Sequence, residues 1–139
     1  MKSTAITRGV RVQVESQWLP ERSDPARNQW FFTYRVRIEN VGTETVQLIS
    51  RHWIIENSRG HVEHVRGPGV VGETPVLAPG QSFTYQSFCP LDTPIGSMHG
   101  TYQMIVTGSP TAGFDAVIAQ CRAAGVSIVG EIPRGLPAL

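Results

Sequence analysis

The chain has 139 residues, and its 12 basic and 11 acidic residues leave a formal net charge of +1. This balance gives no electrostatic reason to expect a nucleic acid or an acidic membrane surface as a partner. A hydrophobic content of 40% is too high for a disordered chain, while 14 Gly and 10 Pro residues are too many for a helical bundle. The length predicts a single domain over residues 1–139.

Apolar and polar residues alternate in several segments, which is the pattern of strands with one buried face. In chain order these segments are 10–15, 32–38, 46–56, 61–66, 83–88 and 102–107. We expect 61–66 to form a hairpin with 46–57. The predicted fold class is all-β, an immunoglobulin-like or fibronectin type III-like antiparallel β-sandwich of about seven or eight strands.

The C-terminal part is open to two interpretations. Apolar residues with helical spacing are Phe114, Val117, Ile118 and Cys121, yet the same segment fits a strand equally well. The pattern therefore predicts either a short helix or a strand within 114–125. Residues 126–132 are expected to be extended.

Cellular location is predicted from what the sequence lacks. No apolar run is long enough to cross a membrane, and residues 1–10 lack the apolar core of a secretory signal. Cys89 and Cys121 belong to no metal or redox motif, so we expect both to be reduced and buried. These features predict a cytoplasmic protein without a membrane partner.

A glycine motif, Gly67-Pro68-Gly69-Val70-Val71-Gly72, is the strongest candidate for a binding site. It matches the dinucleotide fingerprint in letters, but Pro75 and Pro79 exclude the helix that must follow. It is also no ATP-binding loop, because Glu73 stands where that loop needs Lys. Two interpretations stay open: an anion-binding concavity of backbone amides beside Arg66, or an irregular loop that only connects strands.

Arg51-His52-Trp53 is the second candidate. On a strand, Arg51 and Trp53 share one face and His52 takes the other. The simpler interpretation puts Trp53 in the core. The alternative makes Arg51 or His52 an anion clamp, since the predicted hairpin brings this segment beside the glycine motif. The candidate anion-binding residues are Gly67, Gly69, Gly72, Arg51 and Arg66.

Metal binding and catalysis find little support in the sequence. His61 and His64 are three residues apart, so on a strand they point to opposite faces and cannot hold one ion. His99 and Cys89 have no partner at zinc spacing. The segment Gly96–Gly100 has the wrong order for a serine nucleophile motif. We therefore predict no catalytic residues, no metal site and no cofactor.

Five motifs in order resemble the bacterial ApaG family over residues 8–107. They are Arg51-His52-Trp53, the segment from Gly67 to Pro75, Leu77-Ala78-Pro79-Gly80, the segment from Phe83 to Ser87, and the segment from Gly96 to Met104. Residues 120–139 depart from the family pattern. The resemblance implies a fibronectin type III-like sandwich, and it implies that Gly67, Gly69 and Gly72 contact pyrophosphate groups. Related domains in eukaryotes are thought to mediate protein contacts.

These observations lead to a non-enzymatic binding module whose main role is protein–protein interaction with an unknown partner. The alternative is a sensor or binder of pyrophosphate-containing ligands, such as nucleotide polyphosphates, through the Gly67–Gly72 loop. Exposed members of the aromatic set Trp18, Trp30, Phe31 and Phe88 would mark a partner surface. Open sheet edges would also allow a homodimer.

Overall fold

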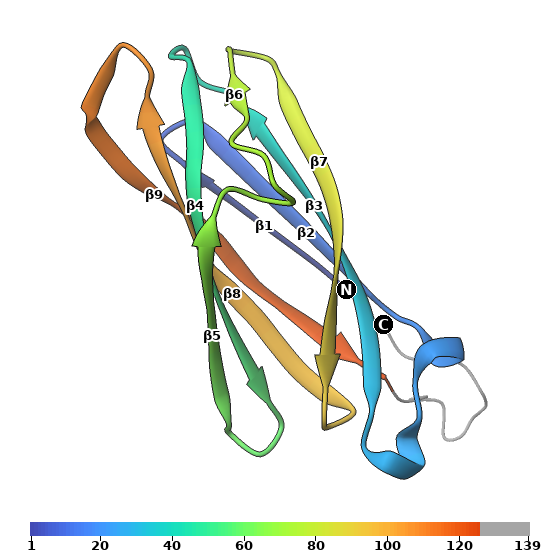
Figure 1. The fold of residues 1–139 in the computed structure, drawn as a ribbon. Coiled ribbons are helices and arrows are strands. Elements are labelled where there is room, and N and C mark those ends of the chain that lie inside the picture. Colours follow the sequence, from blue (N-terminus) through green and yellow to red (C-terminus); the bar gives the residue numbers. More distant parts are fainter. Residues whose placement is uncertain (126–139) are drawn as a thin grey trace.

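A computed structural model describes residues 1–125, and most of them lie in strands. Two antiparallel sheets pack face to face as a β-sandwich (Figure 1), which confirms the predicted fold class. One sheet has the order β1-β2-β3-β7, and the other has β5-β4-β8-β9 with β6 paired to β4. The strands are β1 (Lys2–Thr7), β2 (Val10–Trp18), β3 (Trp30–Asn40), β4 (Val46–Asn57), β5 (Val62–Pro68), β6 (Val76–Leu77), β7 (Ser82–Leu91), β8 (Ile95–Val106) and β9 (Ser109–Ala124).

The segment with two interpretations is a strand, because it forms part of β9. Its register against β8 shifts between the pairs Gly100–Ile118 and Met98–Cys121. This irregularity lets Ile118 and Cys121 both face the core although they are three residues apart. The spacing of these apolar residues, which resembles that of a helix, therefore results from a β-bulge.

Strand β1 was not predicted from the sequence. It pairs with β2 from Lys2–Glu15 to Thr7–Val10, but none of its residues is fully buried, so its apolar alternation is weak. The prediction of an extended 126–132 lies outside the described residues. The predicted hairpin of 46–57 with 61–66 is confirmed by the pairing of β4 with β5.

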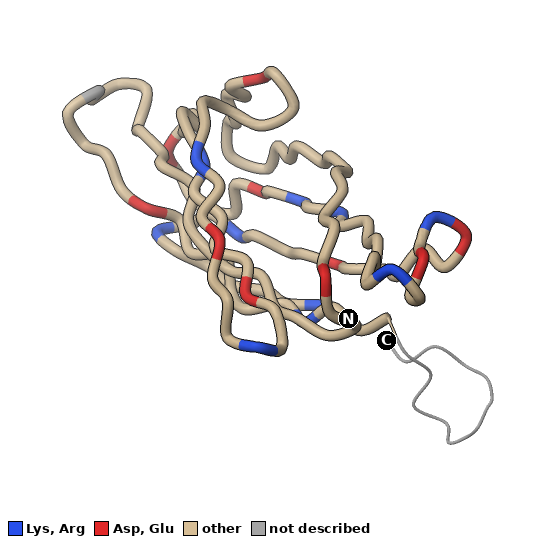
Figure 2. The backbone as a smooth tube through the Cα atoms, turned by 60° about the horizontal axis from the view of Figure 1, so that its bottom comes forward, with Lys and Arg blue, Asp and Glu red and all other residues tan. Residues whose placement is uncertain are grey.

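The core lies between the sheets and is filled by alternate residues of β2, β3, β4, β8 and β9. Trp53 and Tyr102 lie at its centre with their rings edge to face, 6.2 Å apart, and both side chains are fully buried. Cys89 and Cys121 are free thiols and buried, as predicted. Charged residues of both signs are scattered over the strands (Figure 2). Within residues 1–125 no helix has the length and apolar character needed to span a bilayer.

The two lateral sides of the sandwich differ. On one side β1 and β2 meet β9, and three hydroxyl groups form hydrogen bonds that join the sheets. Ser3 Oγ donates to the Ala119 carbonyl at 2.9 Å, and Ser16 Oγ donates to the Arg122 carbonyl at 2.5 Å. The third runs from the β9 backbone to the Thr7 hydroxyl oxygen. On the other side, β5 and β7 are the outer strands of their sheets.

Candidate functional site

A groove opens between the edge strands β5 and β7 and holds a cavity of about 360 Å³. The loop that follows β5 crosses toward β7 at one end of this groove (Figure 1). Both sheets contribute to the floor, which is largely apolar and aromatic. The floor residues are Tyr34, Trp53, Ile55, Val65, Tyr85 and Cys89.

Both rims of the groove carry backbone groups that face away from their own sheets. A hydrogen bond from Asn57 N–H to the His61 carbonyl closes the β4–β5 hairpin. Because hydrogen-bonded and non-hydrogen-bonded pairs alternate along an antiparallel ladder, the odd-numbered residues of β5 direct their backbone groups toward β4. The N–H and C=O groups of His64 and Arg66 therefore point away from β4. By the same alternation along β3 and β7, Thr84 points its backbone groups away from β3. Each rim can accept an added strand.

Aromatic side chains in mutual contact form much of the floor. The rings of Tyr34 and Trp53 lie 5.2 Å apart, and the hydroxyl of Tyr85 is hydrogen-bonded to that of Tyr102. Burial raises the pKa of Tyr34, Tyr85 and Tyr102 above the ordinary value for tyrosine. The hydroxyls are therefore uncharged at neutral pH, and the floor presents packing surface to a bound group.

Cys89 is the one thiol of the floor. It is 2% exposed, and burial raises the pKa of its thiol to about 12. Because the thiolate is the nucleophilic form, a thiol that stays protonated at neutral pH is a poor nucleophile. The groove therefore offers binding surface, with no activated nucleophile among its described residues.

Arg51 closes one end of the groove. Its Nη1 donates to the carbonyl oxygens of Pro68 at 2.9 Å and Gly69 at 3.0 Å. A Cβ atom at Gly67 would lie 2.9 Å from Nη2 of Arg51, so a side chain there would displace the guanidinium from its present position. Arg51 thus ties the glycine motif to β4.

The glycine motif forms a loop that inserts Val70 fully into the core. Gly69 has φ +57°, and a Cβ at this position would collide with the Glu73 carbonyl oxygen. The amide of Gly69 donates to the Ile49 carbonyl, and Val70 and Glu73 exchange backbone hydrogen bonds at 2.8 and 2.9 Å. Three of the loop amides are therefore paired within the protein.

The predicted anion-binding residues do not all come together. Arg51, Gly67 and Gly69 lie side by side, whereas Gly72 has open space around the position of a Cβ. Arg66 pairs with His52 in the β4–β5 register, so its side chain lies on the outer face of the sheet, opposite to that of Arg51. Anion binding by this loop stays a prediction.

The aromatic residues singled out in the sequence divide between core and rim. Trp30 is buried, and Trp18 is half-buried with its indole N–H donating to Ser23 Oγ at 2.9 Å. Phe88 is 56% exposed on the β7 rim and contacts Phe31, with ring centroids 5.7 Å apart. The exposed aromatic surface therefore borders the groove.

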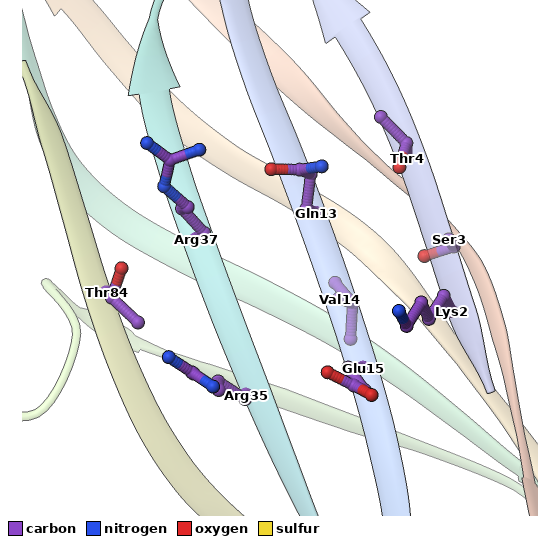
Figure 3. Close-up of a pocket in the computed structure, with 9 residues that line it drawn as sticks. All are labelled: Lys2, Ser3, Thr4, Gln13, Val14, Glu15, Arg35, Arg37 and Thr84. Carbon is purple, nitrogen blue, oxygen red and sulfur yellow. The ribbon is translucent and has the colours of Figure 1, made fainter.

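A second hollow, of about 200 Å³, lies on the outer face of the β1-β2-β3-β7 sheet. Figure 3 shows that side chains from β1, β2, β3 and β7 project around it, with the guanidinium of Arg35 near Thr84. Arg37 shares a salt bridge of 3.2 Å with Glu39. A depression lined by exposed polar chains on a flat sheet face encloses a ligand less well than the groove does.

One pair of histidines meets on the outer face of the other sheet. His52 Nε2 and His64 Nδ1 lie 2.8 Å apart. The sequence analysis considered His61 with His64 and missed this pair, although the predicted hairpin of 46–57 with 61–66 brings the strands of His52 and His64 together. Within residues 1–125, no group of three or more His, Cys, Asp or Glu side chains is arranged to hold a metal ion.

Comparison with known proteins places the chain in a family. The family model for the ApaG domain matches residues 20–106. The chain belongs to the ApaG family. An ApaG protein from Brucella anthropi is 55% identical over 100 residues, which is 72% of this chain and 77% of the relative. An ApaG protein from Anaeromyxobacter dehalogenans is 51% identical over 117 residues, or 84% of this chain and 90% of the relative.

A crystal structure of a Bordetella pertussis protein superposes with a TM-score of 0.80 and 47% identity, covering 83% of this chain and 92% of that one. The resemblance inferred from the five motifs is thereby confirmed. The ApaG match at 20–106 contains β3, β4, β5 and β7, and hence both rims of the groove.

Proposed function

We propose that this ApaG domain is a non-enzymatic protein-binding module. It binds an extended segment of a partner protein in the groove, as a strand added to the edge of β5. The observation that carries this proposal is the cavity of about 360 Å³, with its apolar and aromatic floor, between two strand edges whose outward backbone groups have no strand partner among residues 1–125. Extended peptides recognise such edges through main-chain hydrogen bonds and gain specificity from alternate side chains.

The choice of β5 over β7 rests on exposure. All residues of β5 except Gly67 are exposed, including Val62 and Val65. A strand beside β5 would cover Val65 and turn every second side chain toward Trp53 and Tyr85. The partner segment therefore has apolar residues at alternate positions. No catalytic group is needed for this role.

Selection of binding peptides tests the proposal. A displayed library of random peptides is enriched on the wild-type domain, and one enriched peptide is titrated into isotope-labelled protein. The expected peptides alternate apolar and polar residues, and the expected amide shifts follow β5 and the groove floor. Failure to enrich any peptide above background, or shifts confined to another face, would contradict the proposal.

A matched pair of proline variants decides which rim is used. Arg66→Pro removes an outward N–H from β5 without removing a bond to β4, and Thr84→Pro does the same for β7. We expect Arg66→Pro to weaken peptide binding about tenfold and Thr84→Pro to leave it unchanged. The opposite result would assign the binding edge to β7.

The alternative function is binding of a pyrophosphate-containing ligand through the Gly67–Gly72 loop with Arg51 and Arg66. The guanidinium of Arg51 beside the loop favours it, while the paired amides of Gly69, Val70 and Glu73 do not. Titration of sodium pyrophosphate distinguishes the two functions. Saturable shifts confined to 67–73 that vanish in Arg51→Gln would support the alternative, and silence at millimolar pyrophosphate would reject it. Sedimentation of the free protein tests the edge-paired homodimer.

A further inference from the structure

The outer face of the β5-β4-β8-β9 sheet carries a pair of histidines on neighbouring strands, of which His64 is exposed and His52 is half-buried. In the β4–β5 register His52 stands opposite Arg66, and His64 stands opposite Ile54, so the two histidines occupy diagonal positions on the same face. The strand pairing fixes both backbone positions. The separation of the two rings is thus set by the sheet, while each ring can still turn about its own side-chain bonds.

The two facing nitrogen atoms are 2.8 Å apart, and the ring centroids are 5.1 Å apart. Two imidazole nitrogens that bind one metal ion at right angles, each about 2.0–2.1 Å from it, must be about 2.9 Å apart. Tetrahedral coordination would require about 3.3 Å. The observed spacing is therefore close to that of right-angled coordination, as in tetragonal or octahedral sites, and the rings must turn from their hydrogen-bonded orientation until both nitrogen lone pairs point at the ion.

We propose that His52 and His64 together bind one divalent transition-metal ion, with copper(II) bound most tightly and nickel(II) next. Imidazole is a ligand that both ions favour, both accept right-angled coordination, and copper(II) heads the general order of affinity for nitrogen sites. This site lies on the outer face of its sheet and is independent of the groove and of the function proposed for it.

The surroundings of the pair act in both directions. Arg66 stands opposite His52 on the same face of the sheet, and its charge repels a cation, whereas the charge of Asp115 attracts one. With two protein ligands among the described residues, water fills the remaining positions, and we expect an exchangeable ion.

Calorimetric titration of copper(II) sulfate into the purified domain, with glycine as a competing chelator, measures the binding. We expect one ion per chain, and we expect the electron spin resonance spectrum of the bound copper(II) to show coordination by nitrogen atoms. His52→Gln and His64→Gln should each weaken binding by at least about tenfold, because each removes one of the two ligands. His61→Gln is the matched control and should bind as the wild type does, since His61 lies outside the pair.

Two further measurements separate the site from nonspecific binding. Arg66→Gln should strengthen copper binding by removing the repelling charge. Copper should also raise the unfolding temperature of the wild type but of neither histidine variant, while all variants unfold alike without metal because neither histidine is among the buried residues. Binding that survives both substitutions, or that His61→Gln weakens equally, would overturn the proposal and leave the contact as a hydrogen bond between the two rings.

Discussion

The two lateral sides of the sandwich join the same pair of sheets in opposite ways. Where β1 and β2 meet β9, hydroxyl groups of Ser3 and Ser16 donate to backbone carbonyls of the other sheet. Where β5 faces β7, the loop after β5 crosses the gap at one end, and Val70 is the residue it buries. One side is thus closed by bonds between sheets, and the other is filled by side chains and leaves a groove.

Under the proposed function, this difference assigns stability to one side of the sandwich and binding to the other. Open sheet edges invite uncontrolled strand pairing, and proline limits it because it has no N–H to donate. Pro68 ends β5, and Pro90 lies next to the end of β7, both at positions that face away from the neighbouring strand. The free edge is therefore short and bounded, which suits the capture of a single segment.

The largest effect that we predict is a loss of stability at alkaline pH, caused by Cys89 in the floor of the groove. The pKa of Cys89 is raised from 9.0 to about 12, so the unfolded chain releases this proton at a lower pH than the folded chain does. The free energy of unfolding is therefore fully present below pH 9.0 and falls as pH rises toward about 12. Each pKa unit corresponds to about 1.4 kcal/mol, so this thiol should account for a loss of about 4 kcal/mol in the free energy of unfolding.

Denaturant unfolding between pH 8 and 12 measures this loss, to which the tyrosines of the floor add. Cys89→Ala is the control, because it removes one titrating group and should flatten the pH dependence even though it lowers stability at neutral pH. A pH dependence that is the same in both proteins would contradict the assignment to Cys89.

Gly69→Val should be the most damaging substitution on the open side. Gly69 has φ +57°, and a side chain there would strike the Glu73 carbonyl, so the loop must leave its position and withdraw Val70 from the core. We expect a loss of about 3 kcal/mol or more in the free energy of unfolding, measured by urea denaturation. Gly72→Ala, which meets no atom within 4 Å, should cost only about 1 kcal/mol. Equal losses would mean that the close approach at Gly69 is not what holds the loop.

Arg51→Met should destabilise the protein by about 2 kcal/mol, because it removes a charged donor from two carbonyl oxygens while keeping an apolar stem of similar length. Hydrogen exchange should increase at the Gly69 amide, whose bond to Ile49 depends on the loop staying in place. Unchanged exchange there would show that Val70 alone anchors the loop.

How much of this could be predicted from sequence depended on the range of the interactions. The β4–β5 hairpin and the sandwich follow from local alternation and turns. The bulge in β9 could not be predicted, because the spacing of Ile118 and Cys121 fits a helix as well as a bulged strand. Only the register against β8 distinguishes the two. Arg51 and Arg66 were both candidates for the anion site, and odd and even positions of the paired strands place the two side chains on opposite faces.

The smallest effect we predict compares single side chains across the two sides. Ser16→Ala removes the hydroxyl that donates to the Arg122 carbonyl at 2.5 Å, in a side chain that is 2% exposed, and should cost about 1 kcal/mol. Val65→Ala trims a side chain that is 36% exposed on the open rim and should cost about 0.5 kcal/mol or less. Paired urea unfolding curves measure both losses. If Val65→Ala cost more than Ser16→Ala, the open side would be holding the sheets together, and a partner segment could no longer be expected to bind there without loss of stability.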